Sequence, residues 1–342
     1  MLDKLLSISV AAYNVEQYLD KLVDTVVATE GSERIELLIV NDGSTDGTLA
    51  KAEEYKTKYP EIVKVIDKPN GGHGSTINAG MKNATGKYFR ALDGDDWVDS
   101  GELSKLLKVL DEVDDDLILN NFYYAYESGR IEKEIIKGLD EGVSYKFSDV
   151  ASTIGRMKYH SVVYKTEFLQ KNNIHLDEHC FYVDTEYLLF TIPKVDTVRF
   201  YGFFVYCYRL GLTGQSVSVA SRVKHVDDSE KVAKRLFAFY KRCADELDDS
   251  KRDYLENAVA IHSIWHLGTL VYMDPSKENK KRLMVFDNYL KTHFPELYQR
   301  TNDLYKGSYW NKLLRMLRKT NYSCYPLCKI YTKHEIKKEM KG

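Results

Sequence analysis

The stretch "IELLIVNDGSTDGT", Ile35–Thr48, runs from a nearly continuous apolar segment into a turn rich in aspartate and glycine. A short apolar run that ends at turn residues predicts a buried strand. The spacing of apolar residues over 45–59 predicts a helix directly after it. A strand followed at once by a helix is half of a βαβ unit, so this stretch favours a parallel sheet.

The same alternation extends on both sides, over about residues 1–120. Strands are predicted at 5–13, 35–42, 63–69 and 87–93, and helices at 15–29, 45–59 and 75–83. The predicted fold class is therefore α/β, with a Rossmann-like, mainly parallel sheet covered by helices on both faces. Ligands bind such sheets at the carboxyl ends of the strands, and the four predicted strands are followed by "AAYN", "NDGSTDG", "KPNGGHG" and "DGDD".

The remainder of the chain has a different character. Residues 120–220 are less regular and contain aromatic, strand-like runs such as "NNFYYAYES". After residue 221 the spacing is helical, at 224–247, 251–273, 277–294 and 311–319. We therefore predict two domains, a catalytic domain at 1–220 and a helical domain at 221–342.

Composition excludes some classes of function. The chain has 342 residues, 44% of them hydrophobic, and this composition predicts a soluble globular protein. Its net charge of −2 gives no reason to expect general affinity for nucleic acid. Its five cysteines lack the paired spacing of a zinc site or a disulfide framework, which favours the reducing cytoplasm. The longest late apolar segment, 258–273, is interrupted by polar residues and predicts a buried helix.

Three aspartates follow the fourth predicted strand. In "RALDGDDWVDSGEL", Arg90–Leu103, the side chains of Asp93, Asp95 and Asp96 lie within four positions. Like charges this close raise one another's cost of ionisation, which a bound cation would offset. Aspartate and glycine are also ordinary turn formers, so these residues alone leave a solvated turn and a metal site both open.

Two further segments suggest a bound nucleotide. The glycine-rich segment "NGGHGSTINAG", residues 70–80, leads into a predicted helix start, so its backbone N–H groups and the helix N-terminus can face an anion such as a diphosphate. Asp42 can accept a hydrogen bond from an imide N–H, as uracil offers, although it also suits a cap and turn.

Together with "FYVDTEYLL", residues 181–189, these motifs resemble the inverting family 2 glycosyltransferases, which have a GT-A fold. The resemblance implies a nucleotide-sugar donor, most often a UDP-sugar, and Mn²⁺ or Mg²⁺ as the cofactor. It implies that Asp95 lies nearest the metal and that Asp93 points toward the ribose, as the two carboxylates of the D-x-D motif. The implied donor-binding residues are Ala11, Tyr13, Asn14, Asp42, Asn70, Gly71, Gly72, Asp93, Gly94 and, in a closing loop, Arg209.

The resemblance also implies a catalytic base, Asp184, with Glu186 as the alternative. On the residues alone, Asp184 is equally an ordinary helix cap. The chain departs from the family at Ile77, where many members have arginine. His73 or Arg90 is the candidate to replace that basic residue.

The resemblance implies a metal-dependent inverting glycosyltransferase that moves a hexose or N-acetylhexosamine from a UDP-sugar to a hydroxyl of a glycan acceptor. A cation stabilises the charge that develops on the leaving diphosphate, and a carboxylate takes the proton of the acceptor hydroxyl. Cell-surface polysaccharide, lipid-linked oligosaccharide and glycoprotein glycan stay open as acceptors. The alternative is a non-catalytic, sugar-binding or assembly module with the same fold.

The helical domain is expected to provide homo-oligomer contacts or peripheral attachment at the inner face of the membrane. Basic side chains lie beside leucines in the predicted helix 311–319, a pattern that suits a helix at an anionic lipid surface. A packed helix with a solvated basic face is the alternative.

Overall fold

The computed structural model describes residues 3–212, 215–304 and 308–328. The chain divides into two compact units, residues 1–213 and 214–342. The division lies a few residues before the predicted boundary at 220, within the glycine-containing segment that follows the last strand of the sheet.

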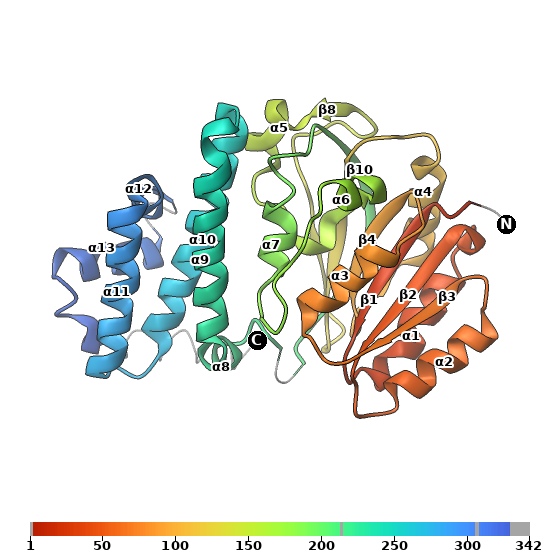
Figure 1. Cartoon of the computed structure of the whole chain (residues 1–342), viewed down its shortest axis with the longest axis horizontal. Helices are drawn as coiled ribbons and strands as arrows, with labels where there is room; N and C mark the ends of the chain where they lie inside the picture. The colour runs from red at the N-terminus through yellow and green to blue at the C-terminus, as the bar shows by residue number, and fades with distance from the viewer. Residues whose placement is uncertain (1–2, 213–214, 305–307, 329–342) are drawn as a thin grey trace. The chain divides into compact units, whose positions relative to one another are not determined.

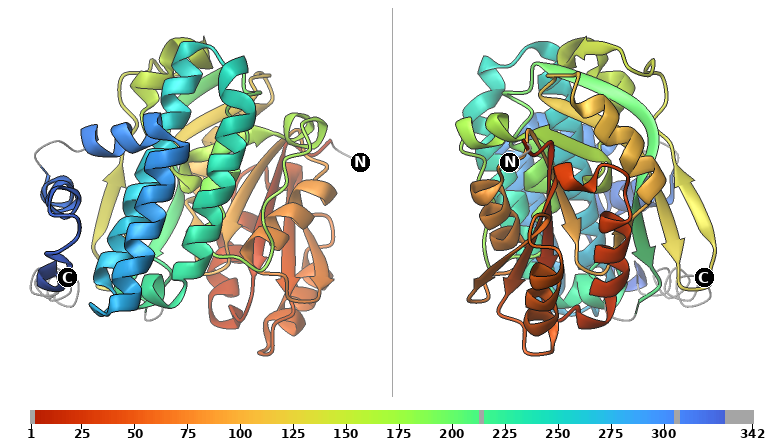
Figure 2. Two further views of the ribbon diagram at one scale, coloured as in Figure 1. Left: turned by 60° about the vertical axis from the view of Figure 1, so that its left-hand side comes forward. Right: turned by 90° about the vertical axis from the view of Figure 1, so that its right-hand side faces the viewer.

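The first half of the sheet consists of four parallel strands in the order β3-β2-β1-β4 (Figure 1). Helices α1 and α2 cover one face of this half of the sheet, and α3 covers the other face (Figure 2). These elements confirm the predicted α/β alternation. Their bounds are β1 (Leu6–Ala12), α1 (Glu16–Val27), β2 (Ile35–Asp42), α2 (Thr48–Lys58), β3 (Val63–Lys68), α3 (His73–Asn83) and β4 (Tyr88–Asp93).

The second half of the sheet is mixed. Strand β9 is antiparallel to both β4 and β6, while β6 and β10 are parallel to each other. The short strands β5, β7 and β8 add antiparallel pairs at β10 and β6. The bounds are β5 (Trp97–Val98), α4 (Ser100–Leu110), β6 (Leu117–Tyr126), β7 (Ile131–Glu134), β8 (Ser144–Lys146), α5 (Phe147–Ile154), β9 (Val162–Lys165), α6 (Thr166–Lys171), α7 (Asp184–Leu189) and β10 (Thr197–Leu210).

Helix α3 lies unusually close to β1, and a glycine makes this possible. A Cβ atom at Gly80 would lie 1.9 Å from Ser9 Oγ, well inside van der Waals contact. Because the helix is held against the sheet here, its N-terminus lies at the carboxyl edge of β1 and β2. Four groups of polar residues at that edge are in contact with one another, as described below.

The C-terminal unit is helical, as expected. Helix α10 packs against α9, α11 and α12, and the long helices lie side by side (Figure 2). Among the helices of the described residues, none combines the length and the apolar character that crossing a bilayer requires. The bounds are α8 (Val219–Lys224), α9 (Val226–Cys243), α10 (Asp249–Tyr272), α11 (Lys277–His293), α12 (Pro295–Asp303) and α13 (Tyr309–Lys319).

Helix α13 contains the leucines and basic residues for which a membrane contact was considered. Leu313, Leu314 and Leu317 are buried within the helical unit. Arg318 also faces inward, and its guanidinium lies 2.6 Å from the buried carboxylate of Asp287. The structure therefore has the alternative arrangement, a packed helix whose exposed basic residues include Lys312, Arg315 and Lys319. Contact with a membrane and contact between copies of the chain stay predictions.

Candidate active site

The loops that follow β1 and β2 are joined by Asn14. Its side-chain oxygen accepts a hydrogen bond from the Thr45 N–H at 2.8 Å, and its own N–H donates to Ser44 Oγ at 3.1 Å. Asn14 has a φ of 54°, a left-handed conformation that asparagine tolerates better than most residues. Tyr13, beside it, is half exposed. Four of the predicted donor-binding residues therefore lie at one edge of the sheet, namely Ala11, Tyr13, Asn14 and Asp42.

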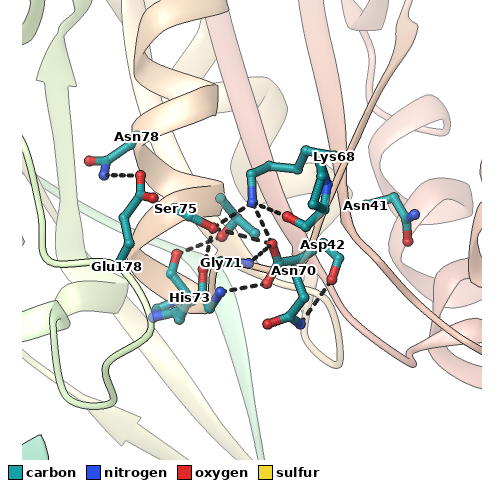
Figure 3. A network of polar contacts seen from close by, with 12 residues as sticks. Asn41, Asp42, Lys68, Asn70, Gly71, His73, Ser75, Asn78 and Glu178 are labelled. Atoms are coloured by element: carbon teal, nitrogen blue, oxygen red, sulfur yellow. Dashed lines mark hydrogen bonds and ion pairs between the residues drawn. The ribbon is translucent and has the colours of Figure 1, made fainter.

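The Asp42 carboxylate binds the glycine segment (Figure 3). Oδ1 accepts hydrogen bonds from Lys68 Nζ at 2.6 Å and the Gly71 N–H at 2.9 Å, and Oδ2 accepts from the Gly72 N–H at 2.8 Å. Asn70 Nδ2 donates to the backbone oxygen of Asp42 at 2.9 Å. In this structure Asp42 accepts from the Gly71 and Gly72 N–H groups, so these groups do not face an open anion site, and their role in donor binding stays a prediction. A carboxylate oxygen has two acceptor positions, so Oδ2 retains capacity for a further donor.

The predicted D-x-D turn lies next to this network. The Gly94 N–H donates to the Ala11 carbonyl at 3.1 Å, and a Cβ at Gly94 would lie 2.6 Å from the same oxygen, so the turn requires glycine. Asp93 Oδ1 lies 3.0 Å from His73 Nε2, at the start of α3. The half-buried carboxylate of Asp95 makes no hydrogen bond to another residue in the described part of the chain.

Asp96 binds β10 through both of its carboxylate oxygens. One carboxylate oxygen accepts from the Tyr206 hydroxyl at 2.6 Å and the other from the Arg209 N–H at 2.7 Å. Arg209 Nε also donates to the backbone oxygen of Asp95 at 2.7 Å, and its Nη1 donates to Glu127. The predicted diphosphate contact Arg209 thus lies beside the aspartate turn and holds its backbone.

The aspartates strongly affect one another's ionisation. Burial and the charge of Asp93 raise the pKa of Asp95 to about 6, and burial with both neighbouring charges raises the pKa of Asp96 well above its ordinary value. Burial alone would raise the pKa of Asp93, but the hydrogen bond and charge of His73 lower it. The negative charges of these aspartates repel one another and are only partly balanced by nearby positive groups. Such hard carboxylate oxygens suit a divalent cation such as Mn²⁺ or Mg²⁺.

A second set of potential metal ligands lies behind the turn. Within the described ranges, ligand atoms of Asp93, Asp96 and His160 all lie within 4.8 Å of one another. However, Asp96 already accepts two hydrogen bonds, and the His160 ring stacks on Tyr208 with centroids 4.0 Å apart. Burial lowers the pKa of His160 to about 4, so the ring is neutral. These contacts favour a structural role for His160.

Asp184 begins helix α7 and lies near the aspartate turn. Burial raises the pKa of Asp184, opposed by the charges of His73 and Arg156. Its interaction with His73 and Asp93 places the predicted base within electrostatic reach of the predicted metal site. The alternative base, Glu186, is fully buried, and its Oε2 accepts a hydrogen bond from the Asp177 N–H at 2.8 Å. This geometry favours Asp184.

His73 and Arg90 were the two candidates to replace the missing basic residue, and the structure separates them. Arg90 is completely buried in β4, where it donates to the His160 carbonyl at 3.2 Å, and burial lowers its pKa to about 10. His73 is partly exposed and contacts Asp93. Burial opposes protonation of His73, but Asp93 raises its pKa overall. Of these two residues, His73 is therefore the one that lies where it could contact a donor bound at the aspartate turn.

Several residues of this site were not predicted. Lys68 and Ser75 bind the Asp42 carboxylate, and Tyr206 binds the aspartate turn. Lys68 and Ser75 flank the glycine segment, so their position in the sequence was a usable signal. Tyr206 is more than a hundred residues from its partner, and nothing in the local sequence of a tyrosine-rich strand distinguishes it.

Known proteins resemble this chain in sequence over its N-terminal part. A family model described as Glycosyl transferase family 2 matches residues 7–173. The Minor teichoic acid biosynthesis protein GgaB of Bacillus subtilis is 31% identical over 180 residues, which are 51% of this chain and 19% of that protein. Glycosyltransferase GlyA of Streptococcus pneumoniae is 33% identical over 37% of this chain and 18% of its own length. The matched part thus spans about a fifth of these relatives.

Solved structures resemble the fold over nearly the whole chain. The crystal structure of residues 1–349 of S. aureus TarS has a TM-score of 0.63 at 20% identity and covers 97% of this chain and 92% of its own. The same protein in complex with UDP-GlcNAc has a TM-score of 0.65 at 18% identity, with the same coverage. The similarity includes the helical unit, so the combination of a GT-A sheet with a following helical region is a known arrangement.

Proposed function

Residues 7–173 belong to glycosyl transferase family 2, and we propose that the enzyme they form is metal-dependent and inverting, with a UDP-sugar as donor and a glycan hydroxyl as acceptor. The observation that carries this proposal is the aspartate turn: Asp95 is half-buried beside Asp93, and the charge of Asp93 acts on Asp184. The interaction between Asp93 and Asp184 supports a cation-binding carboxylate and a candidate base that act in one site. In inversion by direct displacement, the base takes the proton of the acceptor hydroxyl and the cation stabilises the leaving diphosphate.

The residues of the chain have separable tasks in this reaction. Asp95 and Asp93 would hold Mn²⁺ or Mg²⁺, which stabilises the negative charge that develops on the leaving diphosphate. His73 orients Asp93 through its hydrogen bond, while Tyr206 and Arg209 hold the backbone of the turn. Asp184 takes the proton from the acceptor hydroxyl. Its raised pKa makes it a stronger base than an exposed aspartate.

For the donor we propose a uridine nucleotide carrying a hexose or N-acetylhexosamine. The Asp42 carboxylate lies at the sheet edge with acceptor capacity at Oδ2, which suits the imide N–H of uracil. The complex of TarS with UDP-GlcNAc supports N-acetylglucosamine as the first sugar to test. The description of GgaB as a teichoic acid biosynthesis protein supports a cell-surface polysaccharide as acceptor.

A donor screen tests the proposal. The protein is incubated with UDP-, GDP- and dTDP-sugars, with and without Mn²⁺, and release of the free nucleotide is measured. We expect hydrolysis of one or more UDP-sugars, dependent on the metal. Binding of a UDP-sugar without any hydrolysis or transfer to a glycan would favour the non-catalytic module, and hydrolysis restricted to GDP- or dTDP-sugars would contradict the uridine assignment.

Replacing Asp42 by Ala is expected to weaken UDP binding by about tenfold, as for loss of one hydrogen bond to a charged group. The substitution removes the proposed uracil acceptor and also releases the Gly71 and Gly72 N–H groups. Calorimetry with UDP and Mn²⁺ measures the change. Asp67→Ala is the matched control, because Asp67 is an exposed carboxylate at the end of the adjacent strand β3. Equal affinity for UDP in Asp42→Ala and the wild type would remove Asp42 from the donor site.

A further inference from the structure

The loop that leads to Asp184 is bound to helix α3 by one side chain. Asn78 Nδ2 donates to the Leu176 carbonyl at 3.0 Å, and Asn78 Oδ1 accepts from the Leu176 N–H at 2.9 Å. Asn78 Nδ2 also lies 3.3 Å from the carboxylate of Glu178, as Figure 3 shows. One asparagine thus satisfies both backbone groups of a residue nearly a hundred positions away, which fixes the path of the loop at its first residue.

The same loop contacts the glycine segment at close range. The His179 N–H donates to the Gly71 carbonyl at 2.5 Å. A Cβ atom at Gly74 would lie 2.0 Å from the Asp177 carbonyl, so only glycine permits this approach of loop and helix. Since Asp42 accepts from the N–H of Gly71, the glycine segment lies between the proposed nucleotide acceptor and the loop.

The other end of the loop is fixed by Glu186. Its buried Oε2 accepts from the Asp177 N–H, and Glu186 belongs to the first turn of α7, two residues after Asp184. The intervening backbone includes His179 and Tyr182 with φ of 50° and 69°, left-handed conformations that are costly for residues other than glycine. Such a backbone persists only where surrounding contacts determine it.

We infer that Asn78 is a positioning residue for the base Asp184. It holds Leu176 at the start of the loop, Glu186 ties the next residue to α7, and the position of Asp184 at the beginning of α7 follows from both. The inference rests on the proposed function, in which Asp184 is the base. Displacement of a reacting group by about 1 Å can reduce a rate by as much as about 10²-fold, so loss of this contact affects catalysis without removing a catalytic group.

The test is Asn78→Ala, assayed by Mn²⁺-dependent hydrolysis of UDP-GlcNAc and by calorimetry with UDP. We expect kcat to fall about tenfold, within the range for misplaced groups, while the KM for the donor and the Kd for UDP stay within about twofold of the wild type. Asn83→Ala is the matched control, because Asn83 is an exposed asparagine of the same helix whose side chain donates to the Ala79 carbonyl within that helix. A UDP stoichiometry of about one per chain shows that each variant is folded.

A second variant reaches the same loop from the opposite side. Gly74→Ala leaves the Asn78 side chain intact but displaces the Asp177 carbonyl, and we expect the same fall in kcat. Hydrogen exchange of the amides in 176–184 should become faster in both variants, with exchange in β1 and β2 unchanged. Wild-type kcat in Asn78→Ala, or an equal loss of UDP affinity and kcat, would overturn the inference. Failure of the proposed function itself would instead appear in the wild type, as absence of UDP binding and hydrolysis.

Discussion

Replacing Asp95 by Ala is expected to lower the rate of sugar transfer by about 10³-fold, at the upper end of the effects known for loss of one electrostatic stabiliser of a transition state. Of the three aspartates, Asp93 is engaged by His73, and both oxygens of Asp96 accept hydrogen bonds from β10. The Asp95 carboxylate, whose pKa is raised to about 6 by burial and by Asp93, is the one poised to take a cation.

The measurement is the transfer rate as a function of Mn²⁺ concentration, with Mn²⁺ binding followed by calorimetry in the presence of UDP. Asp95→Ala should lose the dependence on Mn²⁺, and removal of the metal from the wild type by a chelator should produce a similar loss of activity. Asp111→Ala is the control, since Asp111 is an exposed carboxylate paired with Arg34, outside the proposed site.

A different result would locate the cation elsewhere. If Asp95→Ala kept its response to Mn²⁺ while His160→Ala lost it, the metal would belong to the group formed by Asp93, Asp96 and His160. The two arrangements share Asp93, so its substitution alone does not distinguish them.

The sequence was sufficient for the first half of the sheet. Strand β2 has the predicted bounds, because a fully buried strand requires a continuous apolar run and the following turn residues end it sharply. Helix α4 was missed although its signals were present: the Asp99 side chain caps the Glu102 N–H, and Leu103, Leu106, Leu107 and Leu110 follow at helical spacing. Strand β9 is only four residues long and pairs with two distant strands, so local pattern does not specify it.

The site was predictable in its location but less so in its internal contacts. Strand ends of a parallel sheet must share an edge, and this placed Asn14, Asp42 and Asp93 together. The direction of individual hydrogen bonds depends on tertiary structure. Asp96 appeared equivalent to Asp93 and Asp95 in the sequence, yet it faces Tyr206 because β10 passes behind the turn. The Gly71 and Gly72 N–H groups bind Asp42 because a buried carboxylate needs hydrogen-bond donors, and the tertiary structure brings these two groups to it.

Replacing Asp184 by Asn is expected to lower transfer by about 10²-fold or more, the range usual for loss of acid–base assistance. Asparagine keeps the size of the side chain and its acceptor oxygen but cannot take the proton of the acceptor hydroxyl. Binding of UDP and of Mn²⁺ should be retained, because the donor residues and Asp95 lie on other elements. Single-turnover transfer with a saturating UDP-sugar, beside calorimetry with UDP, separates the two effects.

Glu186→Gln distinguishes the two candidate bases. Glutamine still offers an oxygen to the Asp177 N–H, so the loop remains attached and the loss of rate should be smaller than for Asp184→Asn. Asp196→Asn, at an exposed aspartate, controls for the removal of a negative charge. If Asp184→Asn transferred sugar at the wild-type rate and Glu186→Gln were inactive, the base would be Glu186. A completely buried carboxylate would then have to become accessible when the acceptor binds, which requires the loop 176–184 to leave the contacts with Asn78 and Gly71 that hold it in this structure.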